Sequence, residues 1–161
     1  MPTRSLVTTF AALLCGCATE YHEPPADEPS ARVIFSNVSA PGMVEFFAHS
    51  DNEECRDALY IRRAFSVHQG QRVTVRFPTT QELTLSANWG TSTESCRIFV
   101  TFRPAAGHQY AALYGHLGQK CKFVVFHDRR PEGGTFETEP SFRVRNANPW
   151  LLGKSCPPES Q

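Results

Sequence analysis

The sequence lacks an excess of charge of either sign, because its 161 residues carry 16 Lys and Arg against 16 Asp and Glu. Binding to nucleic acids, or to anionic surfaces through a basic patch, relies on an excess of positive charge, so this composition argues against both. The chain is not globally disordered either, since 40% of its residues are hydrophobic, including twelve Phe. That amount of apolar material is sufficient for one folded domain.

Sequence motifs of catalytic or cofactor-binding sites are also lacking. The chain contains no Gly-x-Ser-x-Gly nucleophile elbow, no phosphate-binding loop and no dinucleotide-binding glycine fingerprint. Its six histidines form no His-x-His or His-Glu-x-x-His pair; His108 and His116, which bracket one expected hairpin strand, are the first candidates if a site exists. We therefore expect no enzymatic activity, no cofactor and no metal.

A hydrophobic run long enough to cross a membrane is absent from the N-terminal region. Residues 6–14 are mostly apolar and follow a short stretch with one positive charge. A transmembrane helix needs about 20 apolar residues, whereas a secretory signal peptide needs fewer. The pattern predicts that residues 1–16 are a signal peptide and are removed.

The end of this segment, Leu14-Cys15-Gly16-Cys17, resembles the lipobox of bacterial lipoproteins. Members of that family have an aliphatic residue three positions before the lipidated cysteine and a small residue directly before it. Cys17 fits this pattern, whereas Cys15 follows a bulky Leu. The resemblance implies a lipid anchor at Cys17, with acyl chains such as palmitate. It also implies retention in the outer membrane, because Ala18 stands where inner-membrane lipoproteins have Asp. The alternative is an ordinary signal peptide that leaves Cys17 as a thiol.

Residues 18–30 contain three prolines and four acidic residues and hardly any aliphatic ones. Pro-rich segments extend by about 3.1 Å per residue, so we expect a tether of up to roughly 40 Å between the lipid at Cys17 and a single domain formed by residues 31–161.

From residue 31 onward, apolar and polar residues alternate with the period of two that is typical of β-strands. Strands are expected around residues 33–35, 44–46, 59–67, 73–77, 83–89, 98–102, 110–114, 121–126 and 142–144. Short strands with Gly, Pro and polar turns predict an all-β, antiparallel β-sandwich of immunoglobulin-like or transthyretin-like type, with a small β-barrel as the alternative. The layout of residues 31–126 also resembles small β-sandwich envelope lipoproteins of unknown function, which implies no particular site residue.

Four cysteines remain for disulfides in an oxidising compartment, and three pairings are open. They are Cys55, Cys96, Cys121 and Cys156. In a meander, Cys96 and Cys121 would begin strands two spacings of about 4.8 Å apart, which is marginal for a bond whose Cα separation is usually below about 7 Å. Our first expectation is therefore Cys55 with Cys96 and Cys121 with Cys156. A zinc site is disfavoured because no two of them stand in Cys-x2-Cys spacing.

These observations favour a non-enzymatic outer-membrane lipoprotein, facing the periplasm, that presents a surface to an envelope protein or glycan. Two alternatives stay open. One is a small periplasmic enzyme or enzyme inhibitor whose site is built from residues 49–57 and 127–140, and the other is a metal-binding envelope protein. The basic doublets Arg62-Arg63 and Arg129-Arg130 either meet an acidic group or are solvated residues at sheet edges.

Overall fold

The computed structural model describes residues 19–52, 55–117, 120–128 and 136–145. In this part of the chain there are eleven strands, one short 3-10 turn and no α-helix. The described residues accordingly include no helix with the length and apolar character needed to cross a membrane.

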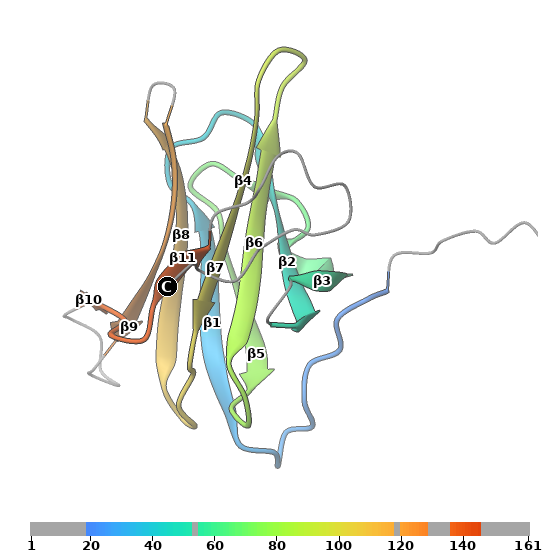
Figure 1. The fold of residues 1–161 in the computed structure, drawn as a ribbon, viewed down its shortest axis with the longest axis vertical. Helices are drawn as coiled ribbons and strands as arrows, with labels where there is room; N and C mark the ends of the chain where they lie inside the picture. The colour runs from blue at the N-terminus through green and yellow to red at the C-terminus, as the bar shows by residue number, and fades with distance from the viewer. Residues whose placement is uncertain (1–18, 53–54, 118–119, 129–135, 146–161) are drawn as a thin grey trace, which may run out of the picture.

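Two sheets pack face to face as a β-sandwich (Figure 1). The strands are β1 (Ser30–Asn37), β2 (Met43–Asp51), β3 (Arg56–Tyr60), β4 (Val67–His68), β5 (Arg72–Pro78), β6 (Leu83–Gly90), β7 (Ser95–Phe102), β8 (Gln109–Leu117), β9 (Lys120–Asp128), β10 (Phe136–Thr138) and β11 (Arg143–Arg145). One sheet has the order β10-β9-β8-β1-β5, and the other has the order β11-β7-β6-β2-β3, with β4 paired to β2. The predicted sandwich is confirmed, although its pairing is not wholly antiparallel because β1 and β8 run in parallel. The barrel alternative is wrong because neither sheet closes on itself.

The alternating residues of the sequence form the core between the sheets. Phe35 of β1 contacts Phe46 of β2 with ring centroids 5.0 Å apart, and Phe46 contacts Phe123 of β9 at 5.5 Å. All three side chains are buried, so the strands of both sheets turn one apolar face inward. Such a two-layer core is what makes a period-two pattern stable in water.

One expected strand, residues 59–67, is interrupted in the structure. β3 ends at Tyr60, and a 3-10 turn at Arg62–Ala64 precedes β4. The turn is closed by the Ala64 N–H, which donates to the Ile61 carbonyl at 2.8 Å, and it buries both Ile61 and Ala64. A continuous strand would have pointed Arg63 to the same side as Ile61, so the turn resolves the one exception in the alternation.

The expected disulfide pairing is wrong, because Cys96 is bonded to Cys121 with a Cα separation of 6.5 Å. The expectation placed both cysteines in one meandering sheet. In the structure β7 and β9 belong to different sheets, so Cys96 and Cys121 meet across the sandwich instead of lying two strands apart within a sheet. The bond joins the β6–β7 and β8–β9 hairpins, which point to the same end of the molecule (Figure 1).

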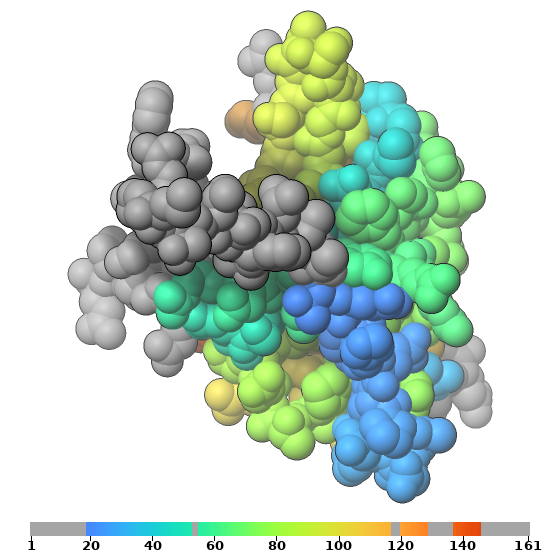
Figure 2. All heavy atoms as spheres, turned by 90° about the vertical axis from the view of Figure 1, so that its right-hand side faces the viewer, coloured from blue at the N-terminus to red at the C-terminus, as the bar shows by residue number. Residues whose placement is uncertain are grey.

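The N-terminal residues 19–29 lie against the sandwich instead of forming the expected free tether (Figure 2). The Tyr21 N–H donates to the Tyr60 carbonyl at 3.0 Å, and the Tyr60 N–H donates to the Thr19 carbonyl at 3.0 Å. The Tyr21 ring stacks on Phe77 at 4.7 Å, and its hydroxyl donates to the Arg76 carbonyl at 2.7 Å. A single aromatic residue thus docks a segment whose overall composition is that of a linker.

Candidate functional site

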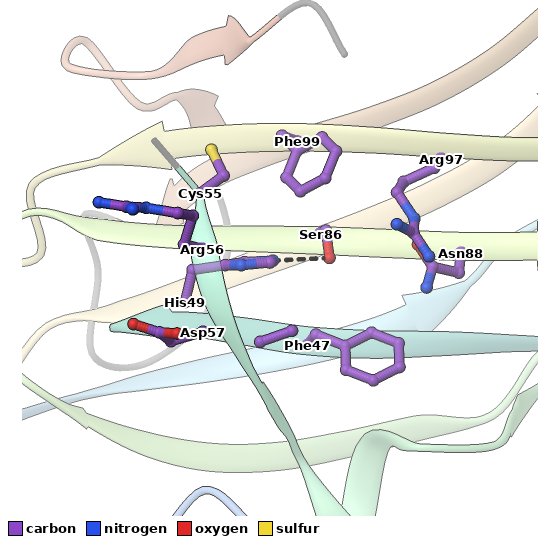
Figure 3. Close-up of a pocket in the computed structure, with 10 residues that line it drawn as sticks. Phe47, His49, Cys55, Arg56, Asp57, Ser86, Asn88, Arg97 and Phe99 are labelled. Atoms are coloured by element: carbon purple, nitrogen blue, oxygen red, sulfur yellow. Dashed lines mark hydrogen bonds between the residues drawn. The ribbon is translucent and has the colours of Figure 1, made fainter. Parts of the chain in front are cut away.

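A pocket of about 400 Å³ lies on the outer face of the six-stranded sheet (Figure 3). We call it the outer-face pocket. It is lined by Phe47, His49, Cys55, Arg56, Asp57, Ala58, Ser86, Asn88, Arg97 and Phe99. The side chains from β2, β6 and β7 come from the positions between the core residues, and the pleat of each strand therefore points them away from the sandwich interior.

His49 and Ser86 form the polar floor of the outer-face pocket. The His49 Nε2 atom and the Ser86 Oγ atom are 2.9 Å apart, on neighbouring strands (Figure 3). His49 is only 6% exposed, and its Nδ1 atom makes no hydrogen bond to the part of the chain that the structure describes. Burial lowers the pKa of His49, although the nearby backbone of Arg56 and Cys55 opposes this. The ring is therefore neutral near pH 7 and has one nitrogen that a bound group could satisfy.

Arg97 supplies positive charge at one end of the outer-face pocket. Its Nε–H donates to Asn88 Oδ1 at 2.8 Å, across the β6–β7 pair. The terminal guanidinium nitrogens of Arg97 make no hydrogen bond to the described residues. At the other end, by contrast, Arg56 is paired with Asp51, the Nε to Oδ2 distance being 3.0 Å. Of the two arginines that line the outer-face pocket, Arg97 is therefore the one whose terminal nitrogens can receive an anionic group.

Two phenylalanines form apolar walls around these polar groups. Phe99 is 1% exposed and lies 5.3 Å from the His49 ring, measured between centroids. Phe47 touches Phe65 edge to face at 5.8 Å, and Phe65 touches Tyr60 in the same way at 5.8 Å. The pocket therefore combines flat apolar surfaces with a few convergent polar groups, as small-molecule sites usually do.

The rim of the outer-face pocket contains two residues in the left-handed backbone region. Cys55 has a φ of 52° and Asp57 a φ of 51°. Non-glycine residues in this region cost on the order of 1–3 kcal/mol each and persist only where surrounding contacts hold them. Cys55 is held because it is disulfide-bonded and packs against Phe99. Its partner lies outside the described residues, since Cys96 and Cys121 are bonded to each other.

The Ser86–His49 pair has the spacing of a nucleophile and its general base, but no carboxylate of the described residues is bonded to His49. In a catalytic triad a carboxylate accepts a hydrogen bond from the far nitrogen of the histidine. Here that nitrogen, Nδ1, has no hydrogen-bond partner among the described residues, and Ser86 is only 2% exposed.

The residues singled out from the sequence are distributed as follows. Cys17 and Cys156 lie outside the described residues, Cys55 lines the outer-face pocket, and Cys96 and Cys121 form a disulfide. His116 contacts Trp89 in a tilted arrangement with ring centroids 4.3 Å apart, and the two residues pair with Cys121 and Cys96 of the disulfide. His108 lies at the opposite end of β8 and contacts His127. The range 49–57, named for the alternative enzyme site, includes His49 and contributes to the outer-face pocket, whereas the sequence did not single out Ser86 or Arg97.

The signal that could have found the pocket is the presence of Phe47 and Phe99 at positions where strand alternation points outward. Aromatic side chains at both odd and even strand positions indicate that the outer face is not simply solvated.

No known protein-family profile matches the chain, and a search of curated protein sequences gave no match either.

Proposed function

We propose that this protein is a lipid-anchored module of the outer membrane, without enzymatic activity, that binds an anionic group of an envelope protein or glycan in the outer-face pocket. The observation that carries the proposal is that, among the described residues, His49 Nδ1 and the terminal nitrogens of Arg97 have no hydrogen-bond partner and lie in a pocket with two aromatic walls. The anchor would be Cys17, as the resemblance to the lipobox implies.

The chemistry of the ligand follows from Arg97 and its surroundings. A guanidinium fork matches the two oxygens of a carboxylate or phosphate better than any other side chain. His49 would satisfy its Nδ1 with a polar group of the same ligand, and Phe47 and Phe99 would contact an apolar or ring portion. A ligand that presents an acidic group beside a flat apolar face, such as an acidic sugar or a peptide carboxylate, therefore fits best.

The docked N-terminal segment supports a position close to the lipid surface. Cys17 precedes Thr19 by two residues, and the Thr19 carbonyl is bonded to β3. Two residues span at most about 7 Å, which replaces the roughly 40 Å of a free tether. The surface beside this segment carries the exposed residues Arg62, Arg63 and Phe65. Cationic and aromatic side chains are the ones that favour the headgroup region of a membrane.

Titration of the purified chain with peptidoglycan fragments and with lipopolysaccharide tests the binding proposal. Loss of a hydrogen bond to a charged group weakens binding by about 10- to 100-fold, so Arg97→Ala should weaken binding by that factor. Arg72→Ala, which removes an exposed cation from β5 in the other sheet, is the matched control and should bind as the wild type does. Absence of saturable binding, or equal binding by Arg97→Ala and wild type, would contradict the proposal.

A small hydrolase is the second candidate, and the observation that favours it is the 2.9 Å contact between His49 and Ser86. Treatment with a fluorophosphonate, which reacts with activated serines, separates the two candidates. The binding proposal predicts no covalent adduct on Ser86, and an adduct that is lost in His49→Gln would favour the hydrolase.

A further inference from the structure

Two histidines that the sequence separates by 19 positions meet at one end of the five-stranded sheet. His108 directly precedes β8, and His127 lies near the end of β9. His108 Nδ1 is 2.6 Å from His127 Nε2, and the two ring centroids are 4.8 Å apart. The pair belongs to the other sheet from the outer-face pocket, so it is a separate feature.

Glu139 and Tyr110 fix the position of His127. Glu139 is 8% exposed, and its Oε2 atom lies 3.7 Å from His127 Nδ1. Its other oxygen accepts hydrogen bonds from the backbone N–H and the hydroxyl of Ser141, at 3.1 and 2.8 Å. Tyr110 stacks on the His127 ring at 5.0 Å with an angle of 20° between the planes.

A carboxylate on the Nδ1 side of an imidazole favours the tautomer that carries its proton on Nδ1. The lone pair of His127 is then on Nε2 and points at His108. The proton between the two rings consequently belongs to His108 Nδ1. In the other neutral tautomer of His108 the proton is on Nε2 instead. The lone pairs of His108 Nδ1 and His127 Nε2 then face each other, and neither ring has gained or lost a proton overall.

The spacing of the two nitrogens shows that one ring has to move before an ion can join them. Metal–nitrogen bonds are about 2.0–2.1 Å long, which places two ligands about 2.9 Å apart at a right angle and about 3.3 Å apart in a tetrahedron. The observed 2.6 Å is a hydrogen-bond distance and is shorter than both values. His108 is exposed and follows Gly107, whose φ is 76°, so it is the ring with room to adjust. Among the divalent first-row ions, Cu(II) binds nitrogen ligands most tightly.

We propose that His108 and His127 form a binding site for one divalent copper ion, with Glu139 as a positioning residue and solvent in the remaining coordination positions. Within the described ranges no group of three or more metal-ligating side chains occurs, so this is an open two-imidazole site rather than a closed structural centre. The sequence pointed to His108 and His116; the structure pairs His108 with His127 instead.

The test is a titration of the untagged full chain with Cu(II) alone, followed by calorimetry and electron paramagnetic resonance. The wild type should bind one ion with a spectrum showing coupling to two imidazole nitrogens. His108→Ala, which removes an exposed side chain, should weaken binding at least tenfold and remove one nitrogen coupling. His68→Ala, an exposed histidine on β4, is the matched control and should leave both affinity and spectrum unchanged.

Glu139→Gln separates positioning from direct coordination. Removal of a carboxylate that orients a histidine ligand typically weakens metal binding by about 10- to 100-fold. We expect that weakening together with an unchanged two-nitrogen spectrum. The proposal is overturned if the wild type binds no copper, or if His108→Ala binds it with the wild-type affinity and spectrum.

Discussion

The Cys96–Cys121 disulfide should be a large contributor to the stability of the sandwich. The replacement of both cysteines by Ser removes the bond without leaving a free thiol at either position. The bond closes a sequence separation of 25 residues. The chain-entropy relation for a loop of that length gives about 3.5 kcal/mol at room temperature, within the usual range of about 2–4 kcal/mol.

Urea unfolding of the double variant, compared with wild type under oxidising conditions, measures this loss. We expect the free energy of unfolding to fall by about 3.5 kcal/mol, because the unfolded chain without the bond regains the entropy of the open loop. Ser95→Ala, at the exposed neighbour of Cys96, is the control and should change stability by less than about 0.5 kcal/mol. A double variant within 1 kcal/mol of wild type would refute the reasoning, as would peptide mapping that links Cys96 to another cysteine.

Four further predictions concern single side chains. Burial raises the pKa of Tyr114 to about 12, and its hydroxyl has no hydrogen-bond partner among the described residues, so Tyr114→Phe should raise the free energy of unfolding. Tyr110→Phe should lower the free energy of unfolding by about 1 kcal/mol, because the Tyr110 hydroxyl accepts from the Ala105 N–H; thermal denaturation measures both changes. Because burial lowers the pKa of His49 in the folded protein, the unfolded chain takes up a proton first as the pH falls below about 6.5. The free energy of unfolding of the wild type should therefore drop by up to about 1.4 kcal/mol per pH unit in that range. His49→Gln should flatten this dependence of the free energy of unfolding on pH. Tyr21→Ala should free the N-terminal segment, which limited proteolysis would detect as faster cleavage before β1, whereas an unchanged cleavage rate would contradict its docking.

Strand positions could be predicted from the sequence because each core strand buries only one face. Leu85 and Ala87 alternate with Ser86 and Asn88, and the structure places the first pair in the core and the second on the outer face. The end of strand β3 at Tyr60 was indicated in the sequence only by Arg63, the one charged residue at an apolar position of the expected strand 59–67. The short strand β10 was missed because it contains a single apolar residue, Phe136, whereas β11 was predicted from the alternation of Phe142 and Val144.

The partition of strands between two sheets is not encoded in local alternation, and the disulfide prediction failed for that reason. The choice of sheet depends on how the β7–β8 connection crosses the sandwich, which is a property of the whole chain. The outer-face pocket was missed for a related reason. Alternation shows that His49 and Phe99 point outward, but it does not show that His49 is buried there and leaves one nitrogen unpartnered.

Docking of the N-terminal segment was hidden by composition, since prolines and acids outnumber the single tyrosine that packs. Glu23 adds to this docking, because it accepts from the Arg76 N–H at 3.2 Å and pairs with the Arg76 side chain at 3.3 Å. A linker composition therefore does not exclude attachment when one aromatic and one acidic residue find matching partners.

The central claim is that Cys17 anchors the sandwich directly at the lipid surface, and metabolic labelling with an alkyne analogue of palmitate tests it most directly. Wild type, Cys17→Ser and Cys15→Ser are labelled in the same cells, and the cysteine two positions earlier provides the matched control. We predict that Cys17→Ser loses the label and fractionates away from membranes, while Cys15→Ser keeps both the label and its membrane location. Equal labelling of wild type and Cys17→Ser would contradict the lipid anchor.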